Sequence, residues 1–103
     1  MRMLMTVSME TAATNAAVRE GKLMTAIQQM LAEVEPEAAY FTNDNDGNRF
    51  GMVVFDMKDS SQMPALAEPW FLGFNAKVTF RPAMSAEDLA AAGPALDRAA
   101  KKK

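Results

Sequence analysis

Residues 38–55, AAYFTNDNDGNRFGMVVF, contain two short runs of β-forming residues separated by turn formers. The first run, 38–42, includes Tyr40 and Phe41, and the second, 50–55, is rich in phenylalanine and valine. Between them, Asp46–Gly47 favours the positive φ angles of a tight hairpin turn. The stretch therefore predicts two antiparallel strands joined as a hairpin.

A strand and a helix are predicted before this hairpin. From Met3 to Met9, apolar residues alternate with less apolar ones, which indicates a strand with one strongly apolar face. Apolar residues then recur at helical spacing as far as Val34, and Pro36 closes the segment. Gly21 either weakens the interior of this helix or marks a bend or a close packing contact.

A second helix and a fourth strand are predicted after the hairpin. Asp59, Ser60 or Ser61 can cap this helix. Pro69 is expected to kink or interrupt it, and Gly73 to end it. Residues 76–81 then alternate apolar and polar side chains, which indicates a half-exposed strand that Pro82 ends.

The C-terminal segment is predicted to be a helical tail, residues 85–103. Ser85 to Asp88 (SAED) has the form of a capping box, which begins a short helix through Ala92. Gly93–Pro94 is expected to stop that helix, and residues 95–100 to add one loose turn. The basic run 101–103 is interpreted as a solvated chain end.

The order of elements is βαββαβ plus a tail. It predicts an α+β, ferredoxin-like domain over residues 1–103, with a four-stranded antiparallel sheet. The helices lie on one face of such a sheet, which leaves the other face uncovered. Leu4 in the first strand, together with Val53 and Phe55 or their neighbours in the third strand, gives the sheet apolar residues on both of its faces. A second copy packed on the uncovered face, in other words a homodimer, is therefore predicted.

Composition excludes several classes of function. The 103 residues include no Cys and no His, and the formal net charge is -2. Disulfides, thiolate nucleophiles, imidazole bases and the common zinc sites are therefore excluded, and an acidic chain is a poor binder of nucleic acid. The DNDGN loop lacks the glutamate of an EF-hand, because Val53 stands at that position. No metal and no cofactor are predicted.

Size and segment composition set further expectations. For a chain of 11.2 kDa, a folded surface of about 5,700 Å² and a radius of gyration of ~13 Å are expected. The N-terminal apolar run is too short for a signal peptide, and no stretch reaches the length of a membrane span. A cytoplasmic location is predicted.

The sequence also resembles known families. The element order is similar to the dimeric α/β-barrel superfamily, in which two ferredoxin-like protomers pack their sheets face to face. The segments EPW (68–70), PxM (82–84) and EDL (87–89) resemble a small uncharacterised family of bacterial domains. This local likeness covers the last third of the chain, and the fold-level likeness covers nearly all of it. The resemblance implies a dimeric barrel and brings no established activity.

Four residues are candidates for a ligand pocket: Tyr40, Trp70, Asn75 and Arg81. Trp70, with Asn75 near it in sequence, can line a cleft with an apolar wall, or it can be a packing anchor whose N–H bonds a carbonyl. Tyr40 can donate a proton or stack on a ligand, or it can simply pack. Arg81, with Lys77, can bind an anion, or it can deter unwanted strand pairing.

Two functional hypotheses follow. The first is a non-enzymatic homodimer, a binding or interaction module in which the ten methionines fill an irregular core or leave a permissive apolar pocket. The alternative, implied by the superfamily resemblance, is a cofactor-independent monooxygenase or isomerase acting on a small apolar or aromatic substrate. Some of those monooxygenases are thought to use Trp, Asn and Arg, which Trp70, Asn75 and Arg81 match in residue type and not in spacing.

Overall fold

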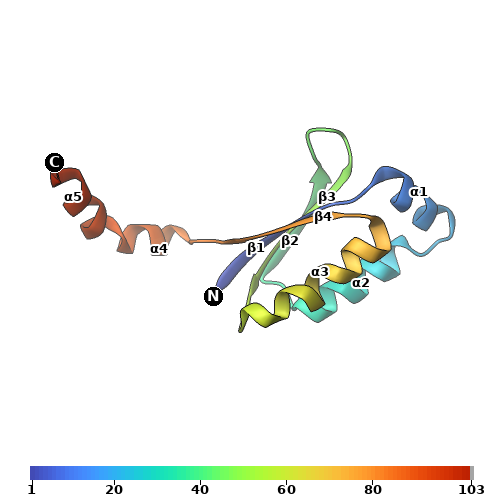
Figure 1. Cartoon of the computed structure of the whole chain (residues 1–103), viewed down its shortest axis with the longest axis horizontal. Helices are drawn as coiled ribbons and strands as arrows, with labels where there is room; N and C mark the ends of the chain where they lie inside the picture. Colours follow the sequence, from blue (N-terminus) through green and yellow to red (C-terminus); the bar gives the residue numbers. More distant parts are fainter. Residues whose placement is uncertain (103) are drawn as a thin grey trace.

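The computed structural model describes residues 1–102, which form a mixed α/β domain with two helices appended to it (Figure 1). In chain order the elements are β1 (Arg2–Ser8), α1 (Thr11–Arg19), α2 (Leu23–Val34), β2 (Ala38–Asn43), β3 (Arg49–Asp56), the 3₁₀ turn η1 (Ser60–Gln62), α3 (Met63–Phe74), β4 (Lys77–Pro82), α4 (Ala86–Ala91) and α5 (Gly93–Lys101).

The four strands form one sheet in the order β2-β3-β1-β4, and every neighbouring pair is antiparallel. The predicted ferredoxin-like βαββαβ fold is therefore confirmed. The predicted hairpin joins β2 to β3, and Gly47 in its turn has φ 80°. The carboxylate of Asp44 holds the loop together, because its Oδ1 accepts hydrogen bonds from the backbone N–H groups of Asp46 and Asn48, both at 2.9 Å.

The first helical segment is split in two at Gly21. Its φ of 69° lies in the left-handed region, which glycine adopts without strain. The backbone N–H groups of Gly21 and Lys22 turn back to the carbonyls of Val18 and Ala17, which closes α1. Of the sequence interpretations of Gly21, the structure shows the bend, and a Cβ atom at this position would meet nothing within 4 Å, so no close packing contact explains the glycine.

Pro69 does not interrupt α3, and Gly73 does not end it. The helix continues through Pro69, which removes one backbone donor, while the buried side chains of Ala67, Trp70 and Phe74 hold both sides of the proline against the core. Gly73 lies inside the helix and does not end it. The helix ends instead at Asn75, which adopts the left-handed conformation (φ 48°) that asparagine tolerates better than most residues.

The core lies between the sheet and two helices. Helices α2 and α3 cover one face of the sheet, and α1 lies at one end of it (Figure 1). The buried core consists of apolar side chains: Met3, Met5, Val7, Met9, Ile27, Val34, Val53, Phe55, Met57, Trp70, Phe74 and Ala76. The face of β1 that the sequence marks as apolar is therefore the core face. The opposite face has no helix on it within residues 1–102.

The tail, α4 and α5, projects away from the body along the longest axis of the molecule (Figure 1). The predicted capping box is confirmed, because Ser85 Oγ accepts from Asp88 N at 3.1 Å and Asp88 Oδ2 accepts from Ser85 N at 2.9 Å. The first tail helix stops before Gly93–Pro94, as predicted. Residues 93–101 form the helix α5 and not one loose turn, since proline is well tolerated in the first turn of a helix. The basic run of the chain end joins α5 as far as Lys101, and its last residue, 103, lies outside the described residues.

The projecting tail changes the expected dimensions. The radius of gyration is 17.0 Å and the longest extent is 58 Å, against the ~13 Å radius expected for a compact chain of this length. No helix within residues 1–102 has both the length and the apolar composition needed to cross a membrane.

Candidate functional site

The four residues predicted to line a pocket lie on both sides of the sheet. Trp70 projects from α3 into the core, where its side chain is fully buried and its ring centroid is 6.1 Å from that of Phe74. Asn75 caps the same helix, and its Nδ2 lies 3.4 Å from Oε1 of Glu10. The indole N–H of Trp70 has no hydrogen-bond partner among the described residues, so it does not bond a carbonyl.

Tyr40 and Arg81 lie on the sheet face that carries no helix. Tyr40 pairs with Met52 across β2 and β3, and Arg81 pairs with Leu4 across β4 and β1. These strands are the two edges of the sheet, so three strand spacings of about 4.8 Å alone separate the two residues by roughly 14 Å, and an offset of two residues along the strands adds to this. The structure therefore does not gather the four residues around one cavity, and a ligand role for any of them stays a prediction.

We call the sheet face without helices the open face. Its centre is apolar, with half-buried side chains on β1 and β3 and the exposed ring of Tyr40 beside them: Leu4, Phe50, Met52 and Val54. The hydroxyls of Thr6 and Thr79 contact each other across β1 and β4. Lys77 and Arg81 lie on the β4 edge of this face and form no ion pair with any of the described residues.

Arg2 links the open face to the tail. Its Nε lies 3.0 Å from Oε1 of Glu37, before β2, and its Nη1 lies 3.4 Å from Oδ2 of Asp88, in α4. The backbone carbonyl of Arg2 also accepts a hydrogen bond from Ala83 N at 3.0 Å. These contacts lie at the point where the tail leaves the body. The two ion pairs are exposed, so each contributes little to the stability of this arrangement.

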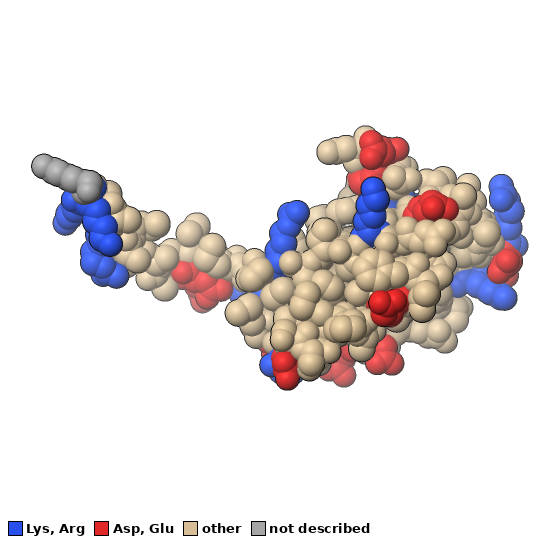
Figure 2. Space-filling model, viewed as in Figure 1, with Lys and Arg blue, Asp and Glu red and all other residues tan. Residues whose placement is uncertain are grey.

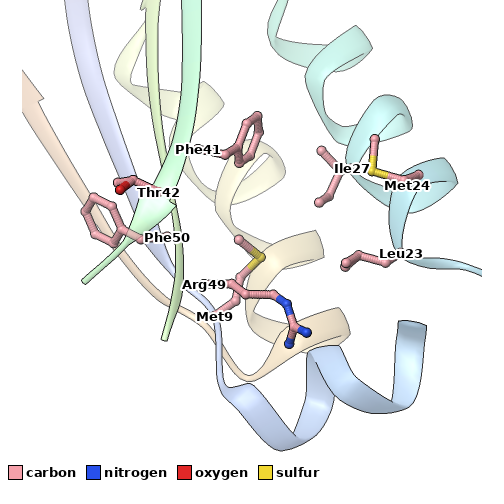
Figure 3. Close-up of a pocket in the computed structure, with 8 residues that line it drawn as sticks. All are labelled: Met9, Leu23, Met24, Ile27, Phe41, Thr42, Arg49 and Phe50. Carbon is pink, nitrogen blue, oxygen red and sulfur yellow. The ribbon is translucent and has the colours of Figure 1, made fainter. Parts of the chain in front are cut away.

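An apolar pocket that the sequence did not indicate lies at the end of the core between α2 and the β2–β3 hairpin (Figure 3). Its volume is about 360 Å³. The lining residues come from the end of β1, α2, β2 and β3: Met9, Leu23, Met24, Ile27, Phe41, Thr42, Arg49 and Phe50. The sequence shows the apolar residues of α2 at helical spacing. The gap between them and Phe41 depends on how segments far apart in the sequence pack together.

Arg49 supplies the charge in this pocket. It is the first residue of β3, it is half-buried, and its guanidinium lies at the end of the pocket nearer α1 (Figure 3). Nη1 donates to Thr14 Oγ1 at 2.6 Å and to Asn15 Oδ1 at 3.0 Å. Thr14 is itself fully buried, and its hydroxyl lies 3.0 Å from the carbonyl of Glu10. The guanidinium is therefore held in place by α1.

Two carboxyl groups have strongly lowered pKa values, for different reasons. Asp44 has its pKa lowered to about 2, first by the hydrogen bond from the Ser8 hydroxyl (2.5 Å) and next by the backbone N–H of Asn48. Asp56 has its pKa lowered to about 2, first by the hydrogen bond from Lys58 (2.6 Å) and next by that from the N-terminal ammonium (2.8 Å). Within residues 1–102, no cluster of three acidic, His or Cys side chains is placed to hold a metal ion.

Comparisons with known proteins add a likeness of fold. No family model and no curated protein matches the chain. Among solved structures, a formyltetrahydrofolate deformylase from Pseudomonas putida KT2440 is similar at 16% sequence identity, with a TM-score of 0.48. The match covers 80% of this chain and 28% of that one, so the chain spans less than a third of the protein that it resembles.

Proposed function

We propose that the protein is a homodimeric interaction module in which two copies pack their open faces together. The observation that carries the proposal is the apolar centre of the open face, which no helix covers within residues 1–102. A single copy exposes 7132 Å², against about 5,700 Å² expected for a folded monomer of this mass. The projecting tail contributes to this excess of roughly 1,400 Å², because no residue of α4 or α5 is buried.

The open face has the composition that such an interface needs. Its apolar centre is flanked by charges at the β4 edge, as in protein interfaces with an apolar core and a polar rim. Tyr40 is 67% exposed in the single copy, and tyrosine is enriched at interfaces. Two sheets packed face to face are the arrangement of the dimeric α/β-barrel superfamily, which this chain resembles in the order of its helices and strands.

The tail supplies the second part of the proposed interface. Large apolar side chains of the tail and of the connection before it have little contact with the body: Leu89 and Leu96 are 53% and 59% exposed, and Met84, before α4, is 69% exposed. Its last turn carries Arg98 and Lys101, and basic side chains gather at its far end (Figure 2). An apolar arm of this length is suited to pack on the second copy. The acidic first turn of α4, with Glu87, complements the unpaired Lys77 and Arg81 of the partner.

Sedimentation equilibrium at micromolar concentration tests the proposal. The wild-type protein is expected at twice the chain mass, and a monomer would overturn the proposal. Val54→Lys, on the open face, is expected to be monomeric, whereas Val18→Lys on α1 is the matched control and is expected to stay dimeric. Tyr40→Lys provides a second test, because a side chain this exposed can be replaced without harm to the core. Circular dichroism confirms that each variant is folded.

The enzyme alternative stays a prediction, because no observation on the described residues favours it. The cytoplasmic location is likewise part of the proposal, on the sequence evidence given above.

A further inference from the structure

Arg49 has no charged partner in the part of the chain that the structure describes. Within residues 1–102 no carboxylate lies within ion-pair distance of its guanidinium. A half-buried charge without a counterion is unfavourable, because part of its hydration has been lost and nothing of opposite sign replaces it. The neutral oxygens of Thr14 and Asn15 bind only Nη1. They orient the group and leave its charge uncompensated.

The free side of the guanidinium is the side that carboxylates bind. With Nη1 occupied, Nε and Nη2 remain without a hydrogen-bond partner among the described residues. These two nitrogens present parallel N–H groups that match the two oxygens of a carboxylate. The contacts of Nη1 with α1 hold this edge in a fixed orientation, which reduces the entropy lost on binding.

The remainder of the pocket suits an apolar body. Around its volume of about 360 Å³ stand Met9, Leu23, Ile27 and the ring of Phe41 (Figure 3). This volume is near the lower end for small-molecule sites, so the ligand is small. Met24 and Phe41 are exposed at the rim, and a flexible methionine can adapt to ligands of different shape.

We propose that this pocket binds a small monocarboxylate with an aryl or short alkyl body. The carboxylate lies on Nε and Nη2 of Arg49, and the body lies against Met9, Ile27 and Phe41. A phosphate is a weaker candidate, because the lining offers a single cation and the walls are apolar. The proposal concerns each copy by itself and goes beyond the proposed dimer, so either proposal can fail while the other stands.

Methionine methyl NMR tests the site without a prior choice of natural ligand. The protein is labelled with [¹³C-methyl]-methionine and titrated with 3-phenylpropionate and, separately, with the neutral 3-phenylpropan-1-ol. The Met9 and Met24 methyl signals are expected to shift saturably with the acid, while those of Met57 and Met84, outside the pocket, stay in place. Octanoate and 1-octanol repeat the comparison with an alkyl body. Absence of a shift at Met9 and Met24 up to millimolar acid would overturn the proposal.

Variants of Arg49 test the role of the charge. Arg49→Gln is expected to weaken binding of the acid at least about tenfold, as for the loss of a charged hydrogen bond, and to leave binding of the alcohol unchanged. Arg49→Lys keeps the charge without the paired N–H groups and is expected to give an intermediate loss. Arg19→Gln, an exposed arginine at the end of α1, is the matched control and is expected to bind as the wild type does. Wild-type protein that binds acid and alcohol equally well would contradict the proposal, whether or not the variants fold.

Discussion

The ring of Phe41 lies directly over Gly51, its cross-strand partner in the β2–β3 pair. A Cβ atom at position 51 would stand 3.0 Å from Cε1 and 3.2 Å from Cδ1 of that ring. Real Cβ contacts are almost always longer than this, so only a glycine leaves room for the ring where it stands. The glycine on β3 thus leaves the space in which the Phe41 ring of β2 forms an aromatic wall of the pocket.

Gly51→Ala is expected to move Phe41 with little change in stability. The ring is partly exposed and can shift, while alanine stabilises by reducing the conformational freedom of the unfolded chain, an effect of about 0.4–1 kcal/mol. The free energy of unfolding in urea is therefore expected to change by less than about 1 kcal/mol. The aromatic proton signals of Phe41 are expected to shift in the same variant. A loss of several kcal/mol would mean that the ring cannot be displaced.

Trp70→Phe is expected to destabilise the protein much less than Trp70→Ala. Alanine removes a fully buried ring and leaves a cavity, which costs about 3–5 kcal/mol. Phenylalanine keeps most of the ring contacts and also removes a buried N–H that has no partner, so part of the lost packing is offset. Denaturant unfolding followed by circular dichroism measures both variants. Equal losses would show that a phenyl ring does not replace the packing of the indole.

Asp44 and Asp56 are expected to respond differently to salt. Both have their pKa lowered to about 2, but the partners of Asp44 are neutral while those of Asp56 are cations. Salt screens interactions between exposed charges, so the pKa of Asp56 is expected to rise at high salt and that of Asp44 to stay low. Carboxyl ¹³C titration by NMR at two salt concentrations measures both values. A rise of the same size at both positions would contradict this assignment of causes.

The stability that Asp44 contributes is expected to be lost only in acid. Its pKa is lower in the folded chain than the ordinary value of 3.8, so the contribution is fully present above pH 3.8 and is lost as the pH falls toward about 2. Asp44→Asn is therefore expected to be less stable than wild type at neutral pH, with a difference that narrows over that acid range. Urea unfolding at several pH values measures the difference. A constant gap would mean that the loss comes from packing of the loop and not from the charge.

Removal of the tail, residues 86–103, is expected to leave the fold of the body intact. No residue of α4 or α5 is buried, and the ion pair of Asp88 with Arg2 is exposed and weak. The melting temperature of a forced monomer such as Val54→Lys is thus expected to change little on truncation. In the wild-type background, truncation is expected to weaken the dimer, which sedimentation equilibrium measures. A tail that stabilises the monomer would speak against its role in the partner contact.

The strands were predictable because their signals are local. The alternation from Met3 to Met9 and the turn residues at Asp46–Gly47 each lie within one element or one hairpin, and both were interpreted correctly. The predictions that differ from the structure concern positions whose conformation depends on tertiary packing. Pro69 stays helical because side chains on both sides of it are buried, and Asn75, rather than Gly73, ends the helix that those contacts prolong.

The pocket could not be predicted for the same reason. Arg49 looks in the sequence like one more residue at the end of a turn, and only the position of Thr14 on α1 shows that its guanidinium is held in place. Tyr40 and Arg81 share the open face, but the strand order that sets them on opposite edges is not a property of either segment alone. The sequence does show apolar residues on α2 and an aromatic residue on β2. That they face each other across a pocket follows only from the position of the hairpin relative to α2.

The first strand in chain order is one of the two central strands of the sheet. β1 pairs with β3 from residue 49 onward and with β4 from residue 77 onward, so both of its neighbours lie more than 40 residues away along the chain. The backbone of β1 can therefore complete its hydrogen bonds only after these distant segments have come together. Folding of this domain is therefore governed by contacts between distant parts of the chain, which are slow to form and expose a growing chain to aggregation.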